Sequence, residues 1–265
     1  MTRAAFIDLI RREGLERWPD LDAQHATGIA DAARLLAGLR GSVVIDHPCV
    51  QGLRMDLDGS VGAKIFCLLC AGAYEAGDFD LYQSHLAPGE RVLELGGGIG
   101  ITAARCAQIT GREVVVVEPN PHLHDLIRRQ ANLNGVSVRI DPRCATGTTA
   151  AEHIPFFLHG EMWRSSMLAE PGESYQQIQV ATVAINSLLD AIRPDVLIVD
   201  IEGAECDLFQ ETPKHFPAKL FIEVHVPRIG EVASADLVER LTRHGYALTD
   251  HRDWMFFFET AAERA

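Results

Sequence analysis

The sequence predicts an α/β fold: a doubly wound, mostly parallel sheet with an antiparallel C-terminal edge and an N-terminal helical extension. Three patterns lead to this expectation. From residue 90 onward, short apolar runs alternate with segments whose apolar residues recur at helical spacing. The run VVVV at residues 114–117 is apolar on both faces, as in parallel strands that are covered on both sides. Residues 246–260, YALTDHRDWMFFFET, have the pattern of a hairpin.

Residues 1–73 are expected to form an extension of helices and short strands. Residues 1–41 carry apolar residues at helical spacing and end at Gly41, which suits a helix terminus. Residues 42–59 alternate like short strands, and residues 61–86 return to a helical pattern. The extension therefore precedes the regular α/β alternation.

The main domain, residues 74–265, carries the alternating elements. We expect strands at 91–95, 113–118, 136–141, 195–201 and 219–226, and helices at 100–110, 121–135 and 235–245. Residues 145–180 interrupt this order between the third and the fourth strand. They are aromatic, punctuated by glycine and proline, and not clearly helical, so we expect an insertion with a functional role.

The stretch RVLELGGGIG at residues 91–100 places four glycines in its last five positions, directly after a strand. Such a cluster lets the backbone approach a ligand closely. The dinucleotide fingerprint G-x-G-x-x-G requires a glycine three residues after the second one, but Ile101 stands at that position after Gly98. A P-loop also fails, because no G-K-[ST] follows.

The glycine stretch instead resembles the first motif, acidic-x-G-x-G-x-G, of class I S-adenosylmethionine-dependent methyltransferases. Glu118 ends the next strand, 18 residues after Gly100 (118 − 100 = 18). An acidic side chain at that place accepts hydrogen bonds from ribose hydroxyls. We therefore expect a nucleoside cofactor, with a nicotinamide oxidoreductase and a cofactor-binding protein without transfer activity as the rival interpretations.

Longer segments make the chain similar to the FkbM family of methyltransferases over residues 74–225. The marks are YE at 74–75, EPNP at 118–121, NLNG at 132–135 and DIEGAE at 200–205. ELGGG departs from the DxGAN form that is more usual in that family, which we expect to alter packing rather than the cofactor. The resemblance implies a Rossmann-like fold, S-adenosylmethionine as cofactor, and O-methylation of a small metabolite, sugar or lipid. N-methylation of a small or carrier-bound amine is the alternative.

The residues expected to bind the cofactor lie in these motifs. They are Tyr74, Glu75, Glu94, Gly96, Gly97, Gly98, Gly100, Glu118, Pro119, Asn120 and Asp200. For Tyr74 and Glu75, ordinary helix termination is the alternative. The residues expected to line the acceptor pocket are Trp163, Ser165 and Ser166, with Arg164, although the insertion's aromatics could equally serve its own packing. The extension is expected to form a lid or wall over this pocket.

Asp200 and Glu202 lie where the fourth strand ends, and Glu223 and His225 where the fifth ends, so these side chains are expected to meet at one edge of the sheet. Three interpretations stay open: His225 or Asp200 is a general base, the group holds a divalent metal, or the residues are structural. In the structural case, Glu202 caps a helix and Glu223 pairs with an arginine. We favour the metal-free base, because these spacings do not demand a full set of oxygen ligands.

The composition bears on partners and compartment. The net charge is −13 and no Lys/Arg run is longer than a pair, whereas nucleic-acid enzymes need a basic face. The N-terminus lacks the apolar core of a signal peptide, and no apolar run reaches transmembrane length. We therefore expect a cytoplasmic enzyme with a small or carrier-bound acceptor and without nucleic-acid or membrane partners. A homodimer stays open.

Overall fold

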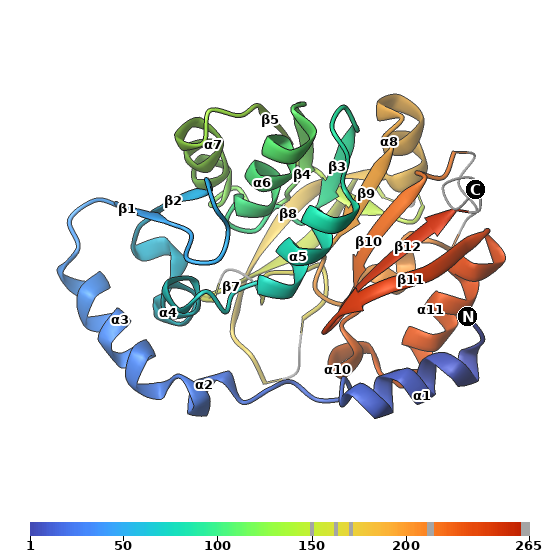
Figure 1. The fold of residues 1–265 in the computed structure, drawn as a ribbon, viewed down its shortest axis with the longest axis horizontal. Coiled ribbons are helices and arrows are strands. Elements are labelled where there is room, and N and C mark those ends of the chain that lie inside the picture. The colour runs from blue at the N-terminus through green and yellow to red at the C-terminus, as the bar shows by residue number, and fades with distance from the viewer. Residues whose placement is uncertain (149–150, 162–163, 170–171, 211–214, 261–265) are drawn as a thin grey trace.

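The structure, a computed structural model, describes residues 1–148, 151–161, 164–169, 172–210 and 215–260. Within these residues, seven strands form a central sheet with helices against both faces (Figure 1). The strands are β3 (Val92–Leu95), β4 (Val114–Val117), β5 (Val138–Asp141), β9 (Val196–Val199), β10 (Lys219–Glu223), β11 (Tyr246–Arg252) and β12 (Met255–Thr260).

The strand order is β11-β12-β10-β9-β3-β4-β5. The pairs from β10 to β5 are all parallel, while β12 and β11 pair antiparallel at one edge. This arrangement confirms the predicted mostly parallel α/β sheet with an antiparallel C-terminal edge. The chain winds from β3 to β4 and β5 on one side and later to β9 and β10 on the other, so the winding reverses beside β3. In open sheets of this kind, ligands bind outside the carboxyl ends of the strands at such a reversal.

The apolar strands explain why the sheet is buried on both faces. Val114 and Val116 belong to one core cluster, and Val115 and Val117 to the other, because successive side chains point to opposite faces. The first face is covered by α4 (Ala63–Ala71), α5 (Ala76–His85), α6 (Ile101–Thr110) and α7 (His124–Leu133). The second is covered by α1 (Arg3–Glu13), α8 (Ile185–Ile192) and α11 (Glu231–Arg243). Each large apolar side chain that is fully buried between the sheet and these helices stabilises the fold by about 1.5–3 kcal/mol relative to an exposed one.

The N-terminal extension is helical with two short strands, as predicted. After α1 it contains α2 (Leu21–Gln24), α3 (Ala26–Gly38) and the antiparallel pair β1 (Val43–Asp46) and β2 (Arg54–Leu57). Phe6 and Ile10 of α1 are buried against the second face, and Arg11 binds Glu231 of α11 at 2.7 Å. At its other end α3 packs on α4. The extension thus runs along one side of the molecule from α11 to α4 (Figure 1).

The helical pattern of residues 61–86 is divided in the structure, contrary to the prediction. The 3₁₀ turn η1 (Gly59–Val61) precedes α4, and residues 72–75 separate α4 from α5. Gly72 ends α4 in the left-handed conformation with φ 67°, and Glu75 begins α5 with φ 51°. Such a backbone costs free energy at a glutamate, so the surrounding contacts must hold it. Tyr74 and Glu75 therefore lie in the segment between two helices and not within one continuous helix.

The insertion at 145–180 contributes to a second sheet that the sequence pattern did not predict. Its strands are β6 (Cys144–Thr146), β7 (His153–His159) and β8 (Tyr175–Ala184), in the order β6-β8-β7. β8 leads directly into α8. Phe156, Leu158 and Val180 form a small core of their own with Cys144, so the insertion packs as a layer rather than as a loop.

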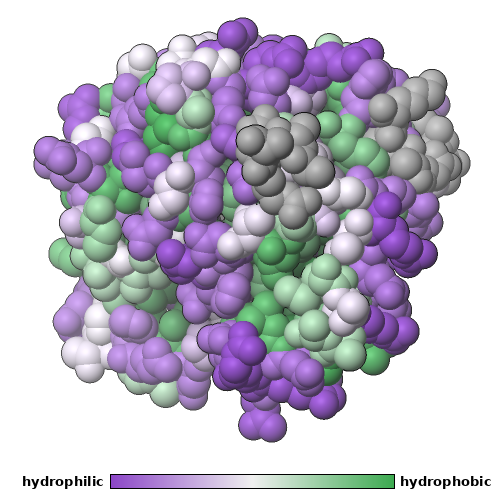
Figure 2. All heavy atoms as spheres, turned by 45° about the vertical axis from the view of Figure 1, so that its right-hand side comes forward, coloured by the Kyte–Doolittle hydropathy of each residue, from purple (hydrophilic) through white to green (hydrophobic). Residues whose placement is uncertain are grey.

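The surface is mixed in character. Figure 2 shows polar side chains over much of one face of the molecule, with apolar areas between them. Across the described ranges of the chain, no helix combines the length and the apolar character required to cross a membrane.

Candidate active site

A cavity of about 530 Å³ lies at the carboxyl ends of β3, β4, β9 and β10. The glycine loop at 96–100 forms one wall, and the end of β9 with the residues that follow it, within 198–204, forms another. Residues 18–22 form a strap that leads from the segment after α1 into the start of α2. This strap and residues 164–167 of the insertion complete the lining. The structure therefore has a cavity at the sheet edge where the strand order predicts a ligand site. Residues of the sheet, the N-terminal extension and the insertion line it.

The glycine loop needs its glycines partly for the protein's own packing. A Cβ on Gly96, whose φ is 89°, would lie 1.7 Å from the carbonyl oxygen of Asp200. A Cβ on Gly100 would lie 2.7 Å from the Cα of Ile127, and one on Gly97 would lie 2.5 Å from Val116. These three glycines let the loop lie against β9, β4 and α7. Gly98 also lines the cavity, but a Cβ on it would meet open space, so the protein's own packing does not require a glycine there.

Glu118 holds the glycine loop in place. The carboxylate is buried and accepts hydrogen bonds from the backbone N–H of Gly97 at 2.9 Å and of Asn120 at 2.7 Å. Burial raises its pKa to about 7, although these hydrogen bonds oppose the rise. Pro119 lines the cavity, whereas Asn120 is outside the lining and closes the turn by accepting the N–H of His122 at 3.0 Å.

Two further acids, Glu75 and Glu94, line the cavity. Glu75 accepts a hydrogen bond from the Thr102 hydroxyl at 2.8 Å, and Tyr74 lies beside it in the lining. Glu94 also lines the cavity and is buried, and its Oε2 has no hydrogen-bond partner in the described part of the chain. Burial raises the pKa of Glu94 well above its ordinary range. An unpaired carboxyl group at a cavity wall suits a cationic ligand group.

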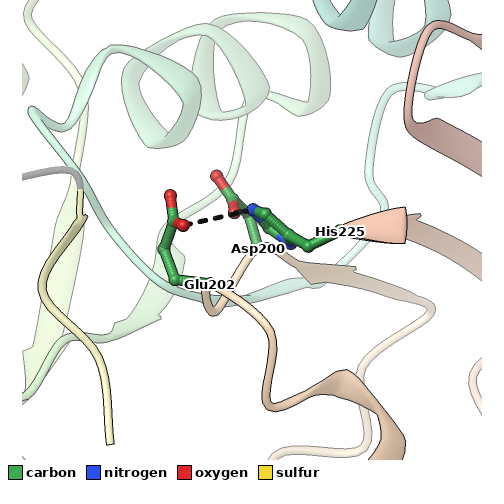
Figure 3. A group of neighbouring side chains, drawn as sticks. All are labelled: Asp200, Glu202 and His225. Atoms are coloured by element: carbon green, nitrogen blue, oxygen red, sulfur yellow. Dashed lines mark ion pairs between the residues drawn. The ribbon is translucent and has the colours of Figure 1, made fainter. Parts of the chain in front are cut away.

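The four residues predicted at the strand ends do come together. Asp200 and Glu202 follow β9, and their carboxylates and the His225 ring converge on one point (Figure 3). The Nε2 of His225 lies 3.4 Å from Glu202 Oε2 and 3.6 Å from Asp200 Oδ1. It also lies 3.9 Å from Oε1 of Glu223, the last residue of β10. We call these four residues the acidic cluster.

Sequence reasoning missed two residues that fix this cluster. Glu205 is fully buried, and its Oε1 lies 2.8 Å from His225 Nδ1 and accepts the N–H of Gly203 at 2.8 Å. Arg228 donates to Glu202 at 3.2 Å. The signal for Glu205 was the third acid of DIEGAE. The arginine pairing expected for Glu223 in the structural interpretation is made by Glu202 instead.

The charges of the cluster favour a protonated imidazole in the protein alone. Burial by itself lowers the pKa of His225, but Glu202, Glu205 and Glu223 together raise it well above its ordinary value. Burial raises the pKa of Asp200 to about 8, although His225 opposes the rise. An imidazolium has no lone pair with which to take a proton from a substrate, which weighs against His225 as the general base.

Some of the insertion residues predicted to line the acceptor pocket do line the cavity, and one lies outside the described residues. Trp163 lies outside the described residues. Ser165 and Ser166 line the cavity, but their hydroxyls are engaged: Ser165 accepts the N–H of His159 at 3.1 Å, and Ser166 donates to the Glu202 carbonyl at 3.0 Å. Arg164 is in the lining and pairs with Glu173 at 2.9 Å. Ser166 therefore ties the insertion to the acidic cluster, whereas the Ser165 bond lies within the insertion.

Trp18 of the strap is a further site residue that sequence reasoning missed. Its ring lies 5.9 Å from the His225 ring and 4.8 Å from the Trp254 ring, and both tryptophans line the cavity. The indole N–H of Trp254 donates to the Leu15 carbonyl at 2.9 Å, which fixes the strap. Trp18 is 47% exposed, a large apolar surface at a cavity wall. The extension thus bounds the cavity next to the acidic cluster.

Comparison with known proteins adds a family match. The family model described as Methyltransferase FkbM domain matches residues 96–260. A comparison with curated proteins found no match.

Similar solved structures include three methyltransferases. The tRNA (uracil-54, C5)-methyltransferase of Pyrococcus abyssi, in complex with S-adenosyl-L-homocysteine, is 13% identical with a TM-score of 0.44; the match covers 83% of this chain and 44% of that one. The precorrin-6y C5,15-methyltransferase of Geobacter metallireducens GS-15 is 12% identical, over 68% and 84% of the two chains, with a TM-score of 0.41. A methyltransferase from Pyrococcus furiosus is 15% identical, over 89% and 96%, with a TM-score of 0.41. The chain thus spans less than half of the first of these proteins, and similarities this low carry no argument about its chemistry.

Proposed function

Because the chain belongs to the FkbM methyltransferase family, and is therefore an S-adenosylmethionine-dependent methyltransferase, we propose that it methylates a hydroxyl oxygen of a small acceptor. The observation that carries this proposal is the acidic cluster, which lies in the same cavity as the glycine loop and Glu118. A hydroxyl is a weak nucleophile until its proton is removed, and the cluster provides carboxylates for that step.

The residues around the cavity fit S-adenosylmethionine. Glu118 has lone pairs left for ribose hydroxyls after its two backbone hydrogen bonds, and Gly98 leaves open space in the loop. The unpaired carboxyl oxygen of Glu94 suits the cationic methionine end. When bound, the cofactor supplies an electrophilic methyl group on a positively charged sulfur.

The proton acceptor is a carboxylate of the cluster with uncommitted lone pairs. Glu205 is engaged by His225 and Gly203, and Glu202 by Arg228. Asp200 and Glu223 are then the carboxyl groups available to take the hydroxyl proton in their ionised forms. Burial raises the pKa of both, that of Asp200 to about 8, so the step is favoured as the pH rises. His225, held between the acids, fixes their positions instead of taking the proton itself.

The acceptor is a small metabolite, sugar or lipid, free or attached to a carrier. The net charge of −13 makes a polynucleotide a poor partner. Trp18 offers an apolar ring surface next to the acidic cluster, where the reactive hydroxyl would be held. An amine acceptor is the alternative, because the same carboxylates would attract an ammonium group.

The proposal is tested by screening acceptors for a gain of one methylene in mass, together with formation of S-adenosylhomocysteine. Hydroxyl acceptors should be methylated, and matched amines should not. Methylation of the amines alone would favour the N-methyl alternative. Cofactor binding without turnover on any acceptor would favour a binding protein without transfer activity.

Glu118→Ala is expected to weaken S-adenosylmethionine binding by about 1.5–3 kcal/mol, the range for hydrogen bonds to a charged group. The measurement is isothermal titration of the folded variant. Glu113→Ala is the matched control, since Glu113 directly precedes β4, at the strand end opposite Glu118, and pairs with Arg139 at the surface. Equal affinity in the Glu118 and Glu113 variants would remove Glu118 from the cofactor site.

The affinity for S-adenosylmethionine should also fall as the pH is lowered through 7. A carboxyl group whose pKa is raised to about 7 in the free protein is protonated below that pH. Ribose hydroxyls donate better to the ionised form, so affinity is full above about pH 8 and falls at lower pH, by at most about tenfold per unit. Titrations of the wild type and of Glu118→Gln between pH 6 and 8 isolate this effect. The same pH dependence in both proteins would contradict it.

Trp18→Ala is expected to lower kcat/KM for the acceptor by roughly 2- to 12-fold, because an aromatic contact is worth about 0.5–1.5 kcal/mol. Cofactor affinity should stay unchanged. A point variant is preferable to deleting residues 1–40, because that deletion would remove Phe6 and Ile10 from the core. Leu35→Ala, on the exposed side of α3 and outside the cavity, is the control. An unchanged kcat/KM in Trp18→Ala would show that the strap serves another purpose.

A further inference from the structure

The imidazole of His225 is oriented as in a metal site. It is 2% exposed, and Nδ1 is fixed by Glu205 at 2.8 Å, which leaves Nε2 as the atom directed toward Asp200 and Glu202 (Figure 3). Histidines that bind metals are commonly held in this way, with a carboxylate on the other ring nitrogen. The carboxylate of Glu205 is fully buried, so its position is set by the fold rather than by solvent.

The separations around Nε2 are longer than those of direct hydrogen bonds. The oxygens of Glu202, Asp200 and Glu223 lie 3.4, 3.6 and 3.9 Å away, beyond the 2.7–3.2 Å of ordinary N–H···O bonds. Two ligands at about 2.0–2.2 Å from one ion are roughly 3–3.5 Å apart when they subtend 90–110° at it. Ligand atoms of Asp200, Glu202 and His225 all lie within 4.8 Å of one another. The Glu202 separation falls within the range for two ligands of one ion and the Asp200 separation lies just above it, so these three side chains leave room for an ion between them.

The site also holds more acidic side chains than cations. Asp200, Glu202, Glu205 and Glu223 surround one imidazole, and the other cation bound to them through a hydrogen bond in the described structure is Arg228. The Oδ1 atom of Asp200 is buried and has no hydrogen-bond partner among the described residues. A buried carboxylate oxygen without a partner is costly unless a ligand completes it.

From this geometry we propose that Asp200, Glu202 and His225 bind a divalent transition-metal ion, with Mn²⁺ as the reference case. One imidazole and two carboxylates form a mixed nitrogen and oxygen set, which suits Mn²⁺ or Zn²⁺ better than Mg²⁺, an ion that prefers oxygen and water. The backbone turns at the ends of β9 and β10 bring the ligands together, and all three residues line the cavity.

The inference goes beyond the proposed function, since metal binding is a property of the protein that can be measured without an acceptor. It also reverses the metal-free preference drawn from the sequence. There, the spacings D-x-E and E-x-H alone did not demand metal ligands. The distances around Nε2 and the contact between Glu205 and His225 are the observations that favour a metal site over a metal-free base. With Asp200 bound to the ion, Glu223 is the carboxylate left to take a hydroxyl proton.

The test is calorimetric titration of the full chain, stripped with a chelator, first with MnCl₂ and then with ZnCl₂. Wild-type protein should bind one ion per chain. Asp200→Asn and His225→Gln should each lose at least roughly tenfold in affinity, and Glu205→Gln roughly 10- to 100-fold, as for other carboxylates that orient a ligating histidine. His85→Gln is the matched control, because His85 pairs with Asp250 at 3.0 Å outside the cavity.

If His225→Gln does not fold, Asp200→Asn and Glu202→Gln carry the test, since both side chains are partly exposed. The proposal is overturned if neither ion binds wild-type protein, or if Asp200→Asn binds as tightly as the wild type. Titration of the stripped protein with S-adenosylmethionine runs in parallel. Intact cofactor binding without metal binding would end the metal proposal and leave the methyltransferase function standing.

Discussion

Glu223→Gln and Asp200→Asn are each expected to lower the turnover number by about 10²- to 10⁴-fold, the usual contribution of a positioned proton acceptor. Among the described residues, both carboxylates have His225 as an ion-pair partner. An amide in place of Glu223 removes a proton acceptor, and an amide in place of Asp200 removes a second acceptor or, where an ion is bound, one of its ligands. Glu223→Gln should leave the affinity for S-adenosylmethionine unchanged. Single-turnover rates with saturating cofactor measure the effect.

The matched control is Glu259→Gln. Glu259 lies on β12 opposite Lys219, at the other end of the strand pair from Glu223, and outside the cavity. It should turn over at the wild-type rate. If Glu223→Gln and Asp200→Asn also kept that rate, the acidic cluster would have no part in the chemistry, and the proton acceptor would have to lie elsewhere in the cavity.

Gly96→Ala is expected to lower the free energy of unfolding by about 3 kcal/mol or more. The new Cβ would lie 1.7 Å from the Asp200 carbonyl oxygen, and φ at this position is 89°. Overpacking and strained backbone each cost about 1–3 kcal/mol. Because the clash pushes on the backbone of Asp200, turnover should fall even in the fraction that stays folded. Denaturant unfolding monitored by circular dichroism measures the loss of stability.

Two other glycines separate the causes of this effect. Gly111→Ala has a similar backbone, with φ 67°, but open space around the new Cβ, so it should cost only the strain. Gly98→Ala, also in open space at φ 48°, should weaken cofactor binding more than it lowers stability. Equal losses of stability in Gly96→Ala and Gly111→Ala would show that contact with Asp200 has no role.

The central sheet was predictable because its signals are local. Runs such as VVVV at 114–117 are apolar at every position, and only a strand buried on both faces satisfies such a run over so short a length. The glycine stretch and the acids after β9 and β10 then fall at strand ends once the order of elements is known. Asp200, Glu202, Glu223 and His225 were placed together by this reasoning.

The second sheet was not predictable on the same grounds. β8 (YQQIQVATVA) alternates only in part and is half exposed, and β7 contains a proline. The break between α4 and α5 was missed because Cys67, Leu68 and Leu69 continue a helical apolar pattern up to Gly72. The left-handed backbone at Glu75 depends on tertiary contacts such as the hydrogen bond from Thr102.

Two site residues were missed because their contacts are remote in sequence. Trp18 lies 207 positions before His225 (225 − 18 = 207), and no local pattern connects the strap to the end of β10. Glu205 was visible as part of DIEGAE, but its hydrogen bond to His225 requires the packing of the turn after β9 against the end of β10. That contact fixes the ring of His225 and is one of the causes of the raised pKa that weighs against His225 as a base.

The most direct test of the whole account is a crystal structure of the chain with S-adenosylhomocysteine. The account predicts the ribose hydroxyls on Glu118, the adenosine and methionine portions along the glycine loop, and the sulfur directed toward the acidic cluster. A sulfur atom directed away from Asp200 and Glu223, or a ribose far from Glu118, would contradict it.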